Sequence, residues 1–95
     1  MAQGGNWFQK LTGRMQLFDE PLPGVPIIEI AGDRRVLVER HRGIIQYTDH
    51  RIRILVNFGI VSVAGQNLVL IQMSKHQLAI SGEIEAVEIQ REVLM

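Results

Sequence analysis

The sequence predicts an all-β domain, a small antiparallel β-sandwich of about eight short strands preceded by a short N-terminal helix. Two observations lead to this prediction. From residue 27 onward, apolar and polar residues alternate with a period of two, which is the period of a strand with one buried face. A glycine or an aspartate also recurs at intervals of 17, 16 and 17 residues, at Gly32, Asp49, Gly65 and Gly82.

The first 26 residues differ from the rest and are expected to form an N-terminal arm. Its apolar residues recur at helical spacing, which predicts a short amphipathic helix, and the segment PLPGVP at residues 21–26 ends that helix. The apolar residues are Trp7, Phe8, Leu11, Met15 and Phe18. Two interpretations stay open: this stripe packs on the domain's own sheet, or it docks on a membrane surface or a partner protein.

Eight segments have strand character, because they are rich in β-branched residues and bounded by turn residues. They are residues 27–32, 34–39, 43–49, 51–56, 59–65, 67–72, 77–82 and 84–90. The apolar phase slips by one position after Ile84, which predicts a β-bulge near Glu85 and Ala86. The chain is therefore divided into an arm (1–26), a β domain (27–90) and a tail (91–95).

The four repeated positions, Gly32, Asp49, Gly65 and Gly82, are expected in turns. Tight turns often need a positive φ or a side chain that caps the turn, and glycine and aspartate meet these needs. Short antiparallel strands at such regular spacing favour a sandwich. A β-solenoid would also explain a period of 16 to 17 residues and is the alternative.

Composition narrows the class of protein. Ten basic and ten acidic residues give a net charge of zero, whereas nucleic-acid-binding domains are usually clearly basic. The chain has no cysteine, which excludes disulfides and thiolate zinc sites. It also has neither a signal-peptide core nor an apolar run near the ~20 residues of a membrane span. We expect a soluble intracellular protein.

The sequence carries no recognisable catalytic or metal-binding motif. His41, His50 and His76 do not follow zinc-ligand spacing and are interpreted as solvated turn residues. Ser74, Lys75 and His76 are adjacent, and adjacent side chains on an extended chain point in different directions. No glycine-rich phosphate loop occurs. We expect no enzymatic activity, no metal and no cofactor.

Arginines are the strongest polar signal. Six of the ten basic residues lie between residues 34 and 53: Arg34, Arg35, Arg40, Arg42, Arg51 and Arg53. A solvated sheet face, a protein-contact face and a nucleic-acid site are the three interpretations. Balanced charge disfavours nucleic acid. Because arginine is enriched at interfaces and the C-terminal strand is acidic, we interpret these arginines as a candidate protein-contact face.

Residues 28–89 resemble the YabP/YqfC family of sporulation proteins, which is found in endospore-forming bacteria. The likeness is carried by IEIAGDRRVLVERHRGIIQYTDHRIRI and VAGQNLVLIQMSKHQLAISGEIEAVEI. The preceding LFDEPLPGVPII is closer to the YqfC branch. This resemblance implies a small cytoplasmic protein of the mother cell, with no established enzymatic activity or cofactor.

The resemblance also suggests two kinds of partner. The YabP branch is associated with spore coat assembly, and the YqfC branch accompanies a membrane protein of the sporulation programme. We therefore expect a protein that works by protein–protein assembly, as a homo-oligomer or with a sporulation membrane protein, and that binds no nucleic acid. The alternative is a peripheral membrane adaptor that binds a sporulation membrane protein through its N-terminal arm.

Overall fold

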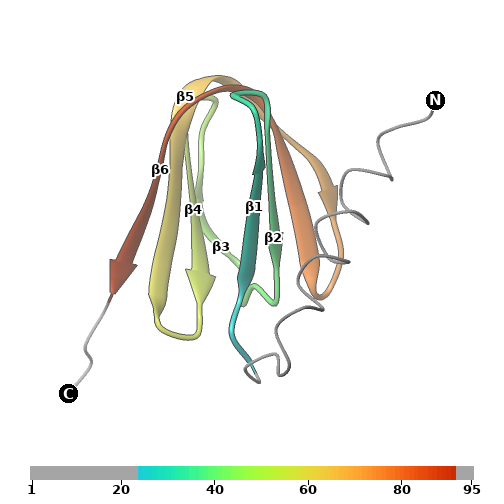
Figure 1. Cartoon of the computed structure of the whole chain (residues 1–95), viewed down its shortest axis with the longest axis vertical. Helices are drawn as coiled ribbons and strands as arrows, with labels where there is room; N and C mark the ends of the chain where they lie inside the picture. The colour runs from blue at the N-terminus through green and yellow to red at the C-terminus, as the bar shows by residue number, and fades with distance from the viewer. Residues whose placement is uncertain (1–23, 92–95) are drawn as a thin grey trace.

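A computed structural model describes residues 24–91 of the chain, and these residues form six antiparallel strands joined in one sheet. The strands are β1 (Ile27–Ala31), β2 (Arg35–Glu39), β3 (Ile44–Tyr47), β4 (Arg51–Val56), β5 (Gly59–Met73) and β6 (Gln77–Arg91). Their order in the sheet is β1-β2-β6-β5-β4-β3 (Figure 1). The all-β prediction is confirmed, and the solenoid alternative is wrong. The expected helix falls outside the described residues.

The sheet folds over on itself because β5 and β6 bend together near their middles (Figure 1). What we call the β2 layer contains β1, β2, residues 77–82 of β6 and residues 66–73 of β5. What we call the β4 layer contains β3, β4, residues 59–65 of β5 and residues 83–91 of β6. Each layer thus has four strand segments. All eight expected segments are present, but two pairs of them are continuous, which leaves six strands.

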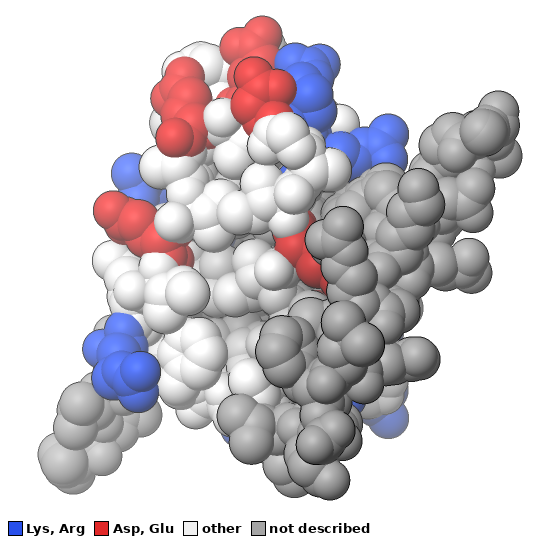
Figure 2. Space-filling view, in the orientation of Figure 1, with Lys and Arg blue, Asp and Glu red and all other residues white. Residues whose placement is uncertain are grey.

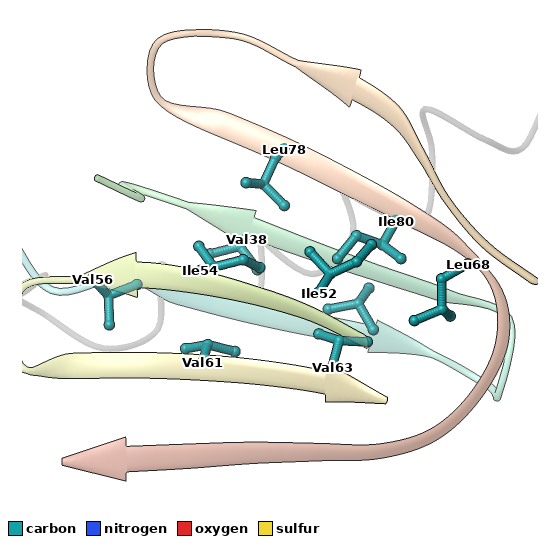
Figure 3. Packing of buried hydrophobic residues seen from close by; sticks show 10 residues of the cluster. Val38, Ile52, Ile54, Val56, Val61, Val63, Leu68, Leu78 and Ile80 are labelled. Atoms are coloured by element: carbon teal, nitrogen blue, oxygen red, sulfur yellow. The ribbon is translucent and has the colours of Figure 1, made fainter. Parts of the chain in front are cut away.

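β-branched and leucine side chains fill the space between the two layers (Figure 3). The β2 layer contributes Val36, Val38, Leu78 and Ile80, and the β4 layer contributes Ile52, Ile54, Val56, Val61 and Val63. All of these side chains are at most 3 % exposed. Each one contributes about 1.5–3 kcal/mol when it leaves water, so this cluster is the main source of stability.

Gly65 and Gly82 lie inside β5 and β6, at the bend, and not in the turns expected from the sequence. A Cβ atom on Gly82 would lie 2.7 Å from the carbonyl oxygen of Asn67, and Gly82 has a φ of +147°. Glycine is needed here because two backbones pass very close to each other. Gly32 and Asp49, by contrast, lie in the turns of hairpins.

All four repeated positions meet at the same end of the sandwich. The N–H of Gly82 donates a hydrogen bond to the carbonyl of Arg34 in the β1–β2 turn (3.2 Å). The N–H of Gly65 donates to the carbonyl of His50 in the β3–β4 turn (3.1 Å). The 16- to 17-residue period therefore reflects two hairpin turns that bond to the bend of the two long strands.

A β-bulge marks the bend on the β6 side. Ala64 pairs with Ala86 and Gly65 pairs with Ile84, so Glu85 is left without a partner in β5. An extra residue of this kind bends its strand and shifts the alternation of faces by one. The bulge predicted near Glu85 and Ala86 from the slip in the apolar phase is confirmed.

Candidate functional site

The six arginines singled out from the sequence do not form one patch. Arg34 lies in the β1–β2 turn and Arg35 begins β2. Arg40 and Arg42 lie in the β2–β3 loop at the opposite end of β2, and Arg51 and Arg53 lie on β4. All except Arg53, which is half-buried, are exposed. The expected single basic face is therefore divided into three pairs.

Arg51 and Arg53 share the outer face of the β4 layer with an acidic residue. Arg53 pairs with Ser62 on β5, and Ser62 pairs with Glu88 on β6, so the row carries a positive group, a hydroxyl and a negative group. The guanidinium of Arg51 donates a hydrogen bond to the Ser62 hydroxyl (Nη1 to Oγ, 3.3 Å). Positive and negative groups therefore lie two strands apart on one face.

Arginine and carboxylate side chains lie near each other elsewhere without pairing. Figure 2 shows basic and acidic side chains next to one another at the end where the β5–β6 bend lies. Among residues 24–91 the ion pair is that between His50 and Asp49 (Nδ1 to Oδ1, 2.8 Å), which requires a protonated histidine. Within these residues, no arginine is held by a carboxylate. Such exposed arginines keep their hydrogen-bonding capacity for a partner.

The two-layered sheet has four open strand edges among the described residues. β1 and β3 are the outermost strands. Because β4 pairs only with residues 59–64 of β5, the second half of β5 is also an edge. Because β2 pairs only with residues 77–81 of β6, the second half of β6 is the fourth edge. An open edge presents N–H and C=O groups that can pair with another strand.

Exposed apolar side chains concentrate on these edges. Among residues 24–91, eight large hydrophobic residues are 38–61 % exposed, and seven of them lie on an edge segment. They are Ile30 on β1, Ile45 and Tyr47 on β3, Val69, Ile71 and Met73 on β5, and Ile89 on β6. The eighth, Leu55, lies on β4, an inner strand. Apolar side chains and open backbone therefore coincide.

One edge is partly closed by a side chain. The Tyr47 hydroxyl accepts a hydrogen bond from the N–H of Leu70 on the second half of β5 (3.0 Å). Tyr47 comes from β3, in the other layer, so this bond also ties the two layers together. The next part of the same edge has a register shift between Leu70 and Gln72.

His41 is a structural residue, and its interpretation as a solvated turn residue is wrong. It is 8 % exposed. The N–H of Gly43 donates to Nδ1 (3.0 Å), so the other nitrogen, Nε2, carries the proton and donates to the carbonyl of Ser74 (3.0 Å). The ring thereby joins the β2–β3 loop to the β5–β6 turn. Its low exposure and its two backbone partners hold the ring in one orientation.

The Ser74–Lys75–His76 segment forms the β5–β6 turn. The Ser74 hydroxyl accepts a hydrogen bond from the N–H of Gln77 (3.2 Å), as turn serines commonly do. A shallow pocket beside this turn is lined by Glu39, Arg40, Ser74, His76 and Gln77. The amide of Gln77 donates to Glu39 (Nε2 to Oε2, 2.8 Å). Residues 24–91 bring no three histidine or acidic side chains together as a metal site.

Glu29 has an environment that the sequence did not indicate. It lies on the outer face of the β2 layer and is only 6 % exposed. Neither of its carboxylate oxygens has a hydrogen-bond partner among the described residues. Burial raises the pKa of Glu29 to about 7, and the nearby negative charge of Glu39 contributes to the rise. In the sequence, Glu29 lies between Ile28 and Ile30, and this alternation indicates only that it faces away from them, not that it is buried.

Comparison with known proteins gives the family. Residues 25–93 match the model of the YabP family. The chain belongs to the YabP family. The "Uncharacterized protein YqfC" of Bacillus subtilis (strain 168) is 22 % identical to it over 77 residues, which cover 81 % of this chain and 83 % of the relative. No solved structure matches. The resemblance to YabP and YqfC is thus confirmed, and membership is consistent with a sporulation-associated role.

The YabP family match spans every described strand and leaves residues 1–24 outside it. The arm residues expected to dock on a sheet, a membrane or a partner also lie outside the described residues; they are Trp7, Phe8, Leu11, Met15 and Phe18. Residues 24–91 contain no helix long and apolar enough to cross a membrane.

Proposed function

We propose that this YabP family protein is a non-enzymatic sporulation protein that acts by protein–protein assembly, through association of its own strand edges. The observation that carries this proposal is the coincidence of open edges with exposed apolar side chains, seven of eight of which lie on edge segments. Strands added to an open edge gain backbone hydrogen bonds and bury alternate side chains at the same time.

The end of β5, residues 71–73, is the edge best suited to self-association, because earlier in this half the N–H groups of Leu68 and Leu70 already donate to the Asp49 carbonyl and the Tyr47 hydroxyl. Residues 67–73, NLVLIQM, contain no charged side chain, and Val69, Ile71 and Met73 are each about half exposed. The β6 edge, in contrast, carries Glu83, Glu85, Glu88 and Arg91, and charges on an edge oppose pairing. Two β5 edges that pair antiparallel about a twofold axis would join two four-stranded layers into one continuous sheet.

The net charge of the chain does not oppose self-association, and its exposed charges make self-association depend on salt. The net charge is zero, so two copies do not repel each other at long range. The row of Arg53, Ser62 and Glu88 lies on the outer face of the β4 layer, away from the β5 edge, and its opposite charges offer a second contact between copies. Contacts between exposed charges weaken as salt increases, since the screening length falls from about 10 Å at 0.1 M to about 3 Å at 1 M.

The proposal also includes where in the cell the protein assembles and with which partner. The resemblance to the YabP branch supports a role in the spore coat, and the resemblance to the YqfC branch supports a sporulation membrane protein as a partner. Both resemblances support a location in the cytoplasm of the mother cell, which is part of this proposal. A fluorescent fusion expressed during sporulation tests this location, and a signal confined to the forespore would contradict it.

Solution mass tests the assembly itself. We expect light scattering over a concentration series to give a multiple of the monomer mass that decreases at high salt. The variant Ile71→Lys places a charge on the β5 edge and should be monomeric. Leu55→Lys is the matched control, because Leu55 is also partly exposed but lies on the inner strand β4. A parent protein that stays monomeric at every concentration would contradict the proposal.

A further inference from the structure

Three neighbouring residues on the outside of the β2 layer are buried. Glu29 pairs with Leu37 across β1 and β2, and Leu37 pairs with Ala79 across β2 and β6. They are 6 %, 7 % and 8 % exposed. Val36 and Val38, on either side of Leu37, belong to the core cluster, and Leu37 does not. The row therefore faces away from the core, on the side of the layer that water would normally reach.

No described strand covers this row. All six strands belong to the two layers, which face each other across the core, so none lies on the outer face. Glu29 is the most informative residue, because it lies on an outermost strand and has a neighbouring strand on one side only. Outward-facing residues on two other edges, Gln46 on β3 and Glu88 on β6, are exposed. Neighbours on both sides can bury an outward residue of an inner strand, as at Ile60 and Ser62 on β5 (7 % and 2 % exposed). An outermost strand such as β1 has a neighbour on one side only, so the burial of Glu29 requires a further cover.

Two segments of the chain outside residues 24–91 can supply such a cover. The four residues after Arg91 leave from the end of β6, in the β4 layer. The segment 1–23 joins β1, the strand that carries Glu29. The Arg40 guanidinium donates a hydrogen bond to the carbonyl of Val25 (Nη1 to O, 3.3 Å), which fixes the start of β1 beside the β2 layer.

We propose that residues 1–23 dock on the outer face of the β2 layer and cover Glu29, Leu37 and Ala79. The apolar stripe of the arm matches this face in chemistry. The face offers Ile27 and Ala31 beside the buried row, and they continue its apolar character along β1. This surface is distinct from the open β5 edge, so the docked arm and self-association do not compete for it.

Trp7 gives a direct readout, because it is the single tryptophan of the chain. In the full chain, at a concentration where light scattering gives the monomer mass, we expect blue-shifted Trp7 emission and an acrylamide quenching constant several-fold below that of free tryptophan. Leu37→Glu should raise the quenching constant several-fold and shift the emission to the red. Leu55→Glu, the same change on the outer face of the β4 layer, should leave both unchanged.

A change within the arm keeps the test decisive if Leu37→Glu fails to fold. Leu11→Asp alters the stripe and leaves the sheet sequence intact. It should expose Trp7 to acrylamide and return the carboxyl of Glu29, followed by NMR, to the titration range of an exposed glutamate. Unchanged values for both Trp7 and Glu29 in Leu11→Asp would overturn the proposal.

Other occupants of the face have their own signatures. If acrylamide quenches Trp7 freely in the monomer and Trp7 is protected only at higher protein concentration, a second copy covers the face. If Trp7 is protected from acrylamide only after vesicles of phosphatidylglycerol and phosphatidylethanolamine are added, the arm binds a membrane. Either result overturns docking of the arm on its own sheet. A monomer with protected Trp7 and no further shift with vesicles supports it.

Discussion

The backbone of β5 at Gly65 passes directly against the backbone of β6 at Glu83. A Cβ atom on Gly65 would lie 1.9 Å from the Glu83 carbonyl oxygen, a separation that real Cβ atoms do not adopt. Both groups are backbone in the middle of paired strands and cannot rotate away. The close approach of these two residues therefore sets the bend at which one sheet becomes two layers.

Gly65→Ala should be among the most destabilising single changes in the β domain. The added methyl group must push β5 and β6 apart at the bend, so we expect a loss of at least about 3 kcal/mol in the free energy of unfolding. Gly32→Ala is the control: its φ is +57°, nothing lies within 4 Å of the added atom, and the strain of the backbone alone costs about 1–2 kcal/mol. Urea denaturation of both variants measures the two losses in the free energy of unfolding. Equal losses would show that the close approach is unimportant.

Glu29→Gln should change how stability depends on pH. Burial raises the pKa of Glu29 from its ordinary value near 4.5 to about 7, so between these values the folded protein holds a proton that the unfolded chain releases. The free energy of unfolding therefore falls by up to about 3 kcal/mol as pH rises from the lower to the higher of these two values. Above the higher value, Glu29 no longer makes the free energy of unfolding depend on pH. The neutral amide removes this fall and makes the variant the more stable protein at pH 8.

We attribute this pH dependence to Glu29 after considering the other residues on the outer face of the β2 layer. Glu39 and Arg35 on β2 are its charged neighbours on the outer face, and β6 contributes only Gln77, Ala79 and Ser81 there. Glu88→Gln, an exposed change on the β6 edge, is the control and should keep the slope. The test is urea denaturation at pH 5, 6, 7 and 8. An identical slope in Glu29→Gln and the parent would refute the assignment.

His41→Ala should loosen the end of the sandwich opposite the bend. The change leaves the Gly43 N–H and the Ser74 carbonyl without their partner, which we expect to cost about 1–3 kcal/mol. His50→Ala, which removes an exposed histidine paired with Asp49, should change stability by no more than about 0.5 kcal/mol. Thermal unfolding compares the two, and hydrogen exchange at Gly43 should quicken only in His41→Ala. Similar stability in both variants would contradict a structural role for His41.

Reversal of charge on β4 should weaken assembly. The double variant Arg51→Glu, Arg53→Glu makes the outer face of the β4 layer wholly acidic around Glu88, so two copies repel where they had opposite charges. Arg34→Glu, Arg35→Glu is a matched double reversal at the β1–β2 turn and keeps that face unchanged. The measurement is the association constant from sedimentation equilibrium at low salt. An equal loss in both variants would implicate net charge, and no loss in either would remove this face from the interface.

The fold was predictable from the sequence wherever a local pattern determines the structure. Ile52 and Ile54 face the core and Arg51 and Arg53 face outward because side chains alternate along any strand, whatever its neighbours. The bulge at Glu85 was visible for the same reason, since one extra residue inverts the alternation.

Features that depend on distant segments could not be read in this way. A glycine gives the same signal in a hairpin turn, as at Gly32, and at a close crossing of two strands, as at Gly65, so two bends were predicted as turns. The burial of Glu29 depends on what lies over the β2 layer, and no local pattern contains that information. His41 likewise looked like a turn residue until the β5–β6 turn came beside it.

The strand order also has a consequence for the newly made chain. The β3, β4 and β5 strands pair with neighbours in sequence and can associate as soon as they leave the ribosome, but β2 must wait for β6, the last of the six described strands along the chain. Until then, the inward face of the β1–β2 hairpin, with Val36 and Val38, has nothing to cover it. If translation stops before residue 77, the β1–β2 hairpin therefore exposes an apolar face that has no strand to pair with. Such a chain is prone to aggregate until β6 has been made.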